Sequence, residues 1–140
     1  MKLTTTENNG FIVHGHEYAD MAMWAGALQY FSHESNKAAG WHTNLETGKP
    51  VERNVAECLC LIHSEISEAL EAHRKGLNDD KLPDRLGIEV ELADALIRIF
   101  DLGGALNLDL GYAFAEKFHY NQTRADHKVE NRAKKDGKKF

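Results

Sequence analysis

Two pairs of acidic residues have the spacing that a metal site on helices needs. Glu65 precedes Glu68 by three positions, and Glu91 precedes Asp94 by the same interval. Residues three apart share one face of a helix, so two adjacent helices could bring all four carboxylates to one place. Crowded carboxylates repel one another and their pKa values rise unless a cation neutralises them. All these donors are oxygens, which favours a hard cation, Mg²⁺ or alternatively Mn²⁺.

A simpler interpretation is that the four carboxylates are solvated flanks of ordinary helices. The chain has 22 acidic residues among 140, so some pairs with this spacing arise by chance. Both pairs nevertheless lie within apolar sequence, at 61–70 and 90–97, which places them at the edge of a buried face. The residues alone leave both interpretations open.

Three polar residues in the last predicted helix are candidates for binding phosphate. Lys117, Asn121 and Arg124 follow one another at spacings of four and three, so on a helix they form one ridge. Lys and Arg side chains bind phosphate oxygens, and Arg does so with a planar fork. The net charge of -5 repels phosphates overall, so a phosphorylated substrate requires such cations or a metal ion. The alternative is an ordinary exposed helix face.

The elements that must position these side chains are helices. Four segments show the apolar periodicity of helices, and none shows the sustained alternation of a strand. We therefore expect an all-α fold, an antiparallel bundle of about four main helices joined by short connections. The predicted helices cover about residues 17–38, 54–75, 90–105 and 109–126.

Residues with capping chemistry support these boundaries. Asn54, with Glu57 three residues later, forms a signal like a capping box, and Gly76 is placed to end the same helix. Asp84 and Asp109 are candidate caps for the two helices that follow.

The composition, 42% hydrophobic and 28% charged, is that of one compact domain, which we place at residues 1–127. Residues 128–140 are polar and basic, and we expect a flexible tail. Cys58 and Cys60 face different sides of a helix, which favours packing thiols in a reducing, cytoplasmic setting. The longest apolar run, 21–28, is too short to span a bilayer. Neither a membrane nor, given the acidic charge, nucleic acid is an expected partner.

The order of these parts resembles the MazG-like, all-α nucleoside triphosphate pyrophosphohydrolases. The similarity covers about residues 54–124, and 24–41 is similar to the helix that precedes them in the family. Its motifs are E-x-x-E on one helix (Glu65, Glu68), E-x-x-D on the next (Glu91, Asp94) and K-x-x-x-N on the last (Lys117, Asn121).

The resemblance implies a Mg²⁺-dependent hydrolase. Such an enzyme cleaves a ribo- or deoxyribonucleoside triphosphate to the monophosphate and pyrophosphate, with water attacking the α-phosphorus. The resemblance assigns metal binding to the four carboxylates of the acidic pairs and substrate binding to Lys117 and Asn121, with Arg124 beside them. Either Glu65 or Glu68 would also orient or deprotonate the water. Family members commonly form dimers or tetramers, so a homodimer or homotetramer is expected.

A nucleobase needs an aromatic or apolar wall. Trp41 and His42, in the loop before the second helix, are candidates for stacking on it, and His33 or Gln29 could meet its edge from the first helix. The alternative for Trp41 is that it plugs a junction between helix and loop. Two further acids, Glu71 and Asp101, extend the acidic stripes, and we expect both to face solvent.

Two other classes of function remain open. A carboxylate-bridged di-iron bundle also uses acids on helices, but it requires two Glu-x-x-His pairs, and Glu116 with His119 is the one candidate. The other class is a non-enzymatic helical interaction module whose basic tail contacts nucleic acid.

Overall fold

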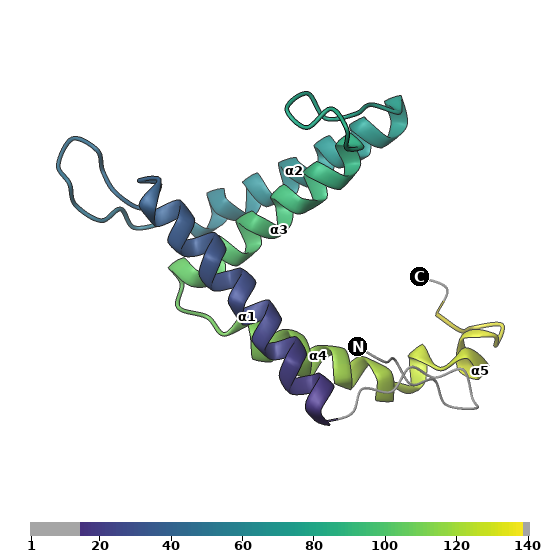
Figure 1. The fold of residues 1–140 in the computed structure, drawn as a ribbon. Helices are drawn as coiled ribbons and strands as arrows, with labels where there is room; N and C mark the ends of the chain where they lie inside the picture. Colours follow the sequence, from purple (N-terminus) through teal and green to yellow (C-terminus); the bar gives the residue numbers. More distant parts are fainter. Residues whose placement is uncertain (1–14, 139–140) are drawn as a thin grey trace. The chain divides into compact units, whose positions relative to one another are not determined.

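The structure is a computed structural model that describes residues 15–138. Its helices are α1 (Gly15–Ala38), α2 (Val55–Lys75), α3 (Gly87–Ala105), α4 (Leu110–Thr123), a 3-10 helix η1 (Ala125–His127) and the one-turn α5 (Val129–Arg132) (Figure 1). Within this described range there is no strand, and β-bridges occur as two isolated pairs. The predicted all-α class with four main helices is therefore confirmed. None of the described helices combines the length and apolar character that crossing a membrane requires.

The chain divides into two compact units. We call Ala27–Leu108 the hairpin unit, because it contains α2 and α3, and we call Met1–Gly26 with Asp109–Phe140 the terminal unit. The helix α1 contributes residues to both.

In the hairpin unit, α2 and α3 lie side by side and antiparallel (Figure 1). Small residues line their contact: Ala69 and Ala95 are buried, and a Cβ added to Gly87 would lie 2.9 Å from the Cβ of Ala72. Small side chains let two helices approach closely, so the buried part of this unit is built largely from alanine and glycine rather than from large apolar residues.

The ends of α2 follow the predicted capping chemistry. The side chain of Asn54 accepts the backbone N–H of Glu57 at 3.3 Å, and Gly76 ends the helix in the left-handed region at φ 62°. Glycine adopts this conformation without steric cost. The predicted capping of α3 by Asp84 is wrong, because the N-cap is Leu86 and no side chain caps this helix.

In the terminal unit, α4 begins as predicted, since Asp109 accepts the backbone N–H of Tyr112 at 3.0 Å. The helix ends at Thr123 rather than near residue 126, because the backbone of Arg124 is extended. Within 128–138, where we expected a flexible tail, α5 forms a single turn, a length that has little helical stability of its own.

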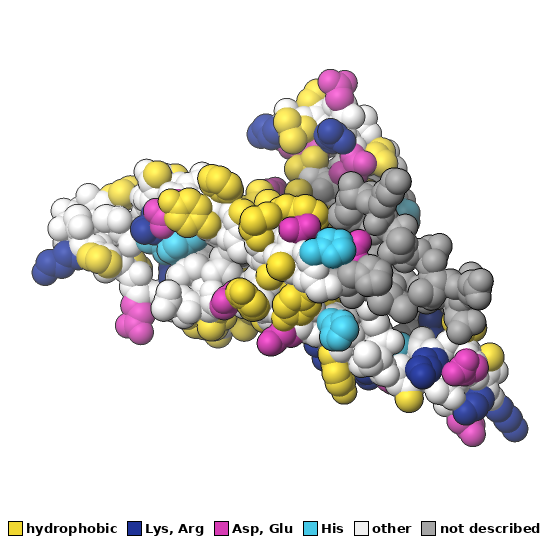
Figure 2. Space-filling model, turned by 60° about the horizontal axis from the view of Figure 1, so that its bottom comes forward, with side chains coloured by type: hydrophobic (Ala, Val, Ile, Leu, Met, Phe, Trp, Pro, Cys, Tyr) yellow, Lys and Arg dark blue, Asp and Glu magenta, His cyan; other side chains and the backbone are white. Residues whose placement is uncertain are grey.

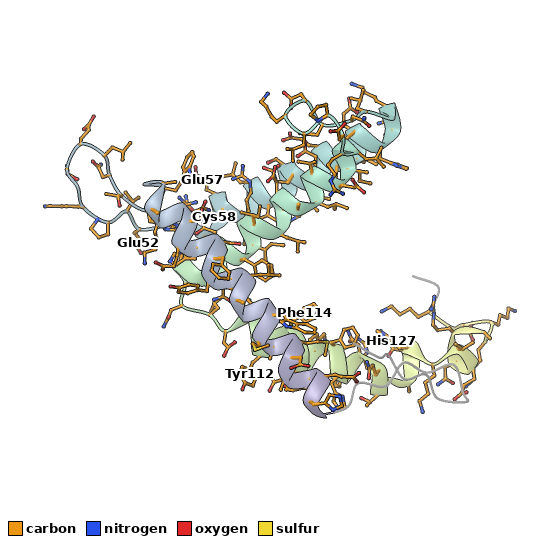
Figure 3. All side chains as sticks on the ribbon, in the orientation of Figure 1. Glu52, Glu57, Cys58, Tyr112, Phe114 and His127 are labelled. Carbon is orange, nitrogen blue, oxygen red and sulfur yellow. The ribbon has the colours of Figure 1, made fainter. Side chains whose placement is uncertain are left out.

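Large apolar side chains remain exposed on both units. On α4 these include Tyr112 and Phe114, labelled in Figure 3. Exposed apolar side chains also cover parts of the face drawn in Figure 2, where they are yellow. Since small residues occupy the buried helix faces, the larger apolar residues of the same helices point outward.

Candidate functional site

Three of the four predicted metal-binding carboxylates meet in the hairpin unit. One oxygen each from Glu65 on α2 and from Glu91 and Asp94 on α3 lie within 4.8 Å of one another. The spacing of three puts Glu91 and Asp94 on the same face of α3. The antiparallel partner α2 presents Glu65 to that face, where Glu65 is only 6% exposed.

Glu68, the fourth carboxylate, lies at the edge of this group. It is exposed and is not among the three whose oxygens converge. Its charge still acts on the group, because the negative charge of Glu68 helps to raise the pKa of Glu91.

The electrostatics of the cluster favour a cation. Burial raises the pKa of Glu91, and the negative charges of Glu68, Glu65 and Asp94 add to the effect, as does a side-chain hydrogen bond with Glu65. Burial and the charge of Glu65 also raise the pKa of Asp94, although Arg98 opposes this rise. Both carboxylates therefore ionise less readily than usual, and a bound divalent cation would reverse this by stabilising the ionised forms.

Arg98 lies beside the three carboxylates, although the sequence analysis did not predict it as part of the candidate site. Its Nε donates to Oε1 of Glu65 at 2.6 Å, which ties α3 to α2 beside the carboxylates. The spacing in the sequence could have predicted this position. Arg98 follows Asp94 by four residues and Glu91 by seven, so all three lie on the same face of the helix. Its partly exposed guanidinium is also suited to binding a phosphate group.

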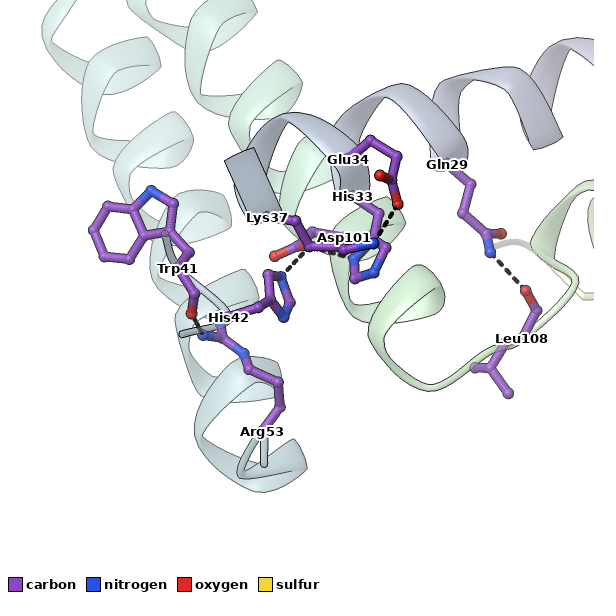
Figure 4. A network of polar contacts seen from close by, with 9 residues as sticks. All are labelled: Gln29, His33, Glu34, Lys37, Trp41, His42, Arg53, Asp101 and Leu108. Carbon is purple, nitrogen blue, oxygen red and sulfur yellow. Dashed lines mark hydrogen bonds and ion pairs between the residues drawn. The ribbon is translucent and has the colours of Figure 1, made fainter. Parts of the chain in front are cut away.

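A cavity of about 280 Å³ opens beside the cluster, which is close to the lower end of the range for small-molecule sites. Its lining includes Glu65, Asp94, Arg98, Asp101, Arg53 and Trp41. Trp41 is 68% exposed, so it does not plug the junction between helix and loop. Arg53 holds the loop at this position, since its Nη1 donates to the backbone oxygen of Trp41 at 3.1 Å (Figure 4).

Asp101 is buried, and our expectation that it faces solvent is wrong. It is 5% exposed, and its Oδ1 lies 2.7 Å from Nε2 of His42 and 3.0 Å from Nδ1 of His33 (Figure 4). The C-terminal part of α1 and the loop that follows cover this end of α3. Gln29 reaches the backbone, donating to the oxygen of Leu108 at 2.6 Å. Glu71 is exposed as expected and pairs with Lys75.

The predicted phosphate-binding residues belong to the terminal unit, whereas the carboxylates belong to the hairpin unit. Lys117 lies over the ring of Tyr120, with Nζ 5.1 Å from its centroid. Arg124 lies beyond the last residue of α4, and its fork binds both oxygens of Asp126 at 2.9 and 2.6 Å. Asn121 has a buried side-chain oxygen with no hydrogen-bond partner among the described residues.

Comparisons with protein family models, with curated proteins and with solved structures found no match to this chain.

Proposed function

We propose that the chain is a Mg²⁺-dependent nucleoside triphosphate pyrophosphohydrolase that cleaves a ribo- or deoxyribonucleoside triphosphate to the monophosphate and pyrophosphate. The observation that carries this proposal is the convergence of Glu65, Glu91 and Asp94 within 4.8 Å, beside a cavity that Arg98 also lines. We further propose that the protein acts in the cytoplasm as a homodimer or homotetramer.

The donor set fits a hard ion. The cluster contains carboxylates and no imidazole, and oxygen ligands suit Mg²⁺ or Mn²⁺ better than they suit zinc. Glu65, Glu91 and Asp94 would hold the ion, with Glu68 reaching it from the edge. When bound, Mg²⁺ neutralises phosphate charge and makes the attacking water more acidic. Among residues 15–138 this cluster includes no histidine, whereas a di-iron centre built on Glu-x-x-His pairs requires two.

The protein's own side chains would position the reactants, which supplies most of the catalysis in phosphate-transfer reactions. Glu65 or Glu68 would take a proton from the water that attacks the α-phosphorus. Arg98 would bind the charge of the departing pyrophosphate, because its guanidinium lines the cavity and remains partly exposed.

Each unit carries further residues that we propose to bind substrate. Lys117, Asn121 and Arg124 would bind phosphate or sugar oxygens, and Arg124 would have to release Asp126 to do so. Trp41 would supply the wall for the base, as its ring is exposed next to the cavity. The side chain of His42 already contacts Asp101 through Nε2, so its ring would support the loop rather than meet the base.

A substrate panel tests this activity. Canonical and damaged nucleoside triphosphates would be incubated with Mg²⁺, and pyrophosphate and nucleoside monophosphate would be followed together. Equal amounts of the two products are expected. Release of orthophosphate instead, or no turnover of any substrate, would contradict the proposal.

Matched variants test the site. Asp94→Asn and Glu68→Gln each remove one negative charge with little change in volume, so the fold should persist while kcat falls by about 10²- to 10³-fold, as when other preorganised electrostatic groups are removed. Glu89→Gln on α3 and Glu71→Gln on α2 are the controls, because both glutamates are exposed on the same helices, and their kcat should stay near that of the unmodified protein. Near-normal hydrolysis by Asp94→Asn at saturating Mg²⁺ would show that Asp94 does not bind the ion.

A further inference from the structure

Two histidines and an aspartate converge at the far end of α3 from Gly87. Nδ1 of His33, Nε2 of His42 and one carboxylate oxygen of Asp101 lie within 4.8 Å of one another. They come from α1, from the loop after it and from α3, and all three side chains are largely buried. Asp101 lies seven residues, or about 10 Å along the helix, beyond Asp94. This cluster is therefore distinct from the carboxylate cluster.

Asp101 is a buried carboxylate whose ion-pair partners among the described residues are the imidazoles of His33 and His42. The carboxylate accepts hydrogen bonds from Asn36, His33 and His42. No lysine or arginine among residues 15–138 forms an ion pair with it. Two imidazoles and a carboxylate are ligands that transition metal ions bind, and a divalent ion between the three side chains could be coordinated by all of them.

The surroundings hold these donors in place. A Cβ added to Gly104 would lie 2.4 Å from Cγ of His33, so this glycine leaves the space that the imidazole occupies. Asn36 donates to the carboxylate of Asp101, as is typical of the groups that support metal ligands from outside. Asp101 also lines the cavity of about 280 Å³, which provides a route for an ion from solvent.

The distances are close to those of a metal site. Zinc binds imidazole nitrogen and carboxylate oxygen at about 2.0–2.2 Å in tetrahedral geometry, which separates neighbouring ligand atoms by about 3.3–3.6 Å. The two contacts to Asp101, at 2.7 and 3.0 Å, are hydrogen bonds, so the imidazoles would have to move apart from the carboxylate by a few tenths of an ångström when a metal binds. Each imidazole now donates N–H to the carboxylate, and moving that proton to the other ring nitrogen leaves a lone pair for the metal.

We propose that His33, His42 and Asp101 bind a divalent transition metal ion of the Zn²⁺ class, which fastens the loop at residues 39–54 to α1 and α3. The two imidazole nitrogens distinguish this site from the all-oxygen cluster and favour zinc over magnesium. Three protein ligands leave a fourth position for water. This site does not depend on the hydrolytic activity proposed above.

Metal binding by the unmodified 140-residue chain is the first test. Co²⁺ would be added to chelator-treated protein and its visible absorption recorded, followed by displacement with Zn²⁺ in competition with a chromophoric chelator. One equivalent of Co²⁺ should give the intense bands of a four- or five-coordinate site, and Zn²⁺ should remove them. Failure to bind one equivalent of Zn²⁺ with micromolar or tighter affinity would overturn the proposal.

Variants identify the ligands. His42→Gln and Asp101→Asn should each weaken Zn²⁺ binding by at least about 100-fold, and Asn36→Ala by about 10- to 100-fold, the range for groups that support ligands. Circular dichroism would establish that each variant is folded. Three controls should bind Zn²⁺ as the unmodified protein does: Asp94→Asn removes a carboxylate of the other cluster, Cys60→Ser removes the exposed thiol and His63→Gln removes an exposed imidazole.

The controls distinguish Zn²⁺ binding at His33, His42 and Asp101 from binding elsewhere in the chain. Unchanged affinity in folded His42→Gln would overturn the assignment, as would loss of affinity in Asp94→Asn or Cys60→Ser. In both cases the ion would be bound elsewhere, whereas loss confined to His42→Gln, Asp101→Asn and Asn36→Ala supports the site.

Discussion

A proton and a metal ion compete for the same carboxylates in the hairpin unit. Glu91 and Asp94 both have raised pKa values, first because of burial and then because of neighbouring negative charges. Metal affinity depends on the ionised form of each ligand. The affinity of the cluster for Mg²⁺ should therefore rise with pH through the acidic range and level off once both groups are ionised.

The raised pKa values of Glu91 and Asp94 also predict how the free energy of unfolding changes with pH when no metal is bound. A carboxylate with a raised pKa binds its proton more tightly in the folded state than in the unfolded state, so the free energy of unfolding falls as pH rises from the usual carboxylate pKa through the raised one. Urea unfolding in a chelator, measured over this pH range, should show that Asp94→Asn loses less stability with rising pH than the unmodified chain. An equal or steeper loss in Asp94→Asn would contradict the proposed crowding of Asp94.

At the scale of helices, close approach depends on residues without large side chains. Ala115 on α4 is fully buried, and a Cβ added to Gly111 would lie 2.4 Å from the backbone oxygen of Ala22 on α1. In the hairpin unit the same principle operates between Gly87 and Ala72. Both contacts tolerate little added volume, because the nearest atom is backbone at Gly111 and a short alanine Cβ at Gly87, and neither can move aside as a long side chain can.

Two glycine-to-alanine substitutions, one in the tight contact and one outside it, test this packing. Gly111→Ala should destabilise the protein by about 1–3 kcal/mol through overpacking. Gly26→Ala is the matched control, because a Cβ there meets nothing within 4 Å, and it should stabilise the helix by about 0.5–1 kcal/mol. Chemical unfolding measures both. If Gly111→Ala unfolds at the same urea concentration as the unmodified chain, α1 and α4 do not approach as closely as the structure describes.

At the scale of the whole molecule, α3 of the hairpin unit carries an apolar stripe that is exposed in the described part of the chain. Leu92, Leu96 and Ile99 follow one another at spacings of four and three on α3, and all are exposed. Exposed apolar surface of this kind is typical of interaction sites. A second copy of the chain would bury such a stripe symmetrically, and the homodimer or homotetramer stays a prediction.

One charge placed in the stripe tests this assembly. Leu96→Glu should shift the protein towards the monomer in size-exclusion chromatography with light scattering, because an unpaired charge cannot be buried at an interface. Leu45→Glu is the control, since Leu45 is highly exposed in a loop, and its oligomeric state should not change. A monomeric unmodified chain, or an unaffected Leu96→Glu variant, would exclude this stripe as the interface.

Short-range features of this protein were predictable from the order of its residues. Apolar periodicity located the four main helices, and the caps at Asn54 and Asp109 were correct. The predicted cap at Asp84 was wrong, although it too relied on residue type and position. The spacing of Glu91 and Asp94 also predicted their shared face, because helix geometry depends on neighbours within one or two turns.

Long-range convergence was not predictable in the same way. Asp101 lies 68 positions from His33 and 59 from His42, and no periodicity within α3 shows that a loop and a second helix will cover it. Contacts of this kind depend on how each helix is rotated about its axis and how closely it approaches the next one, which the small residues at Gly104 and Gly87 permit. Backbone hydrogen bonds specify a helix locally, whereas burial of Asp101 and pairing of Glu65 with Arg98 arise only when separate segments pack together.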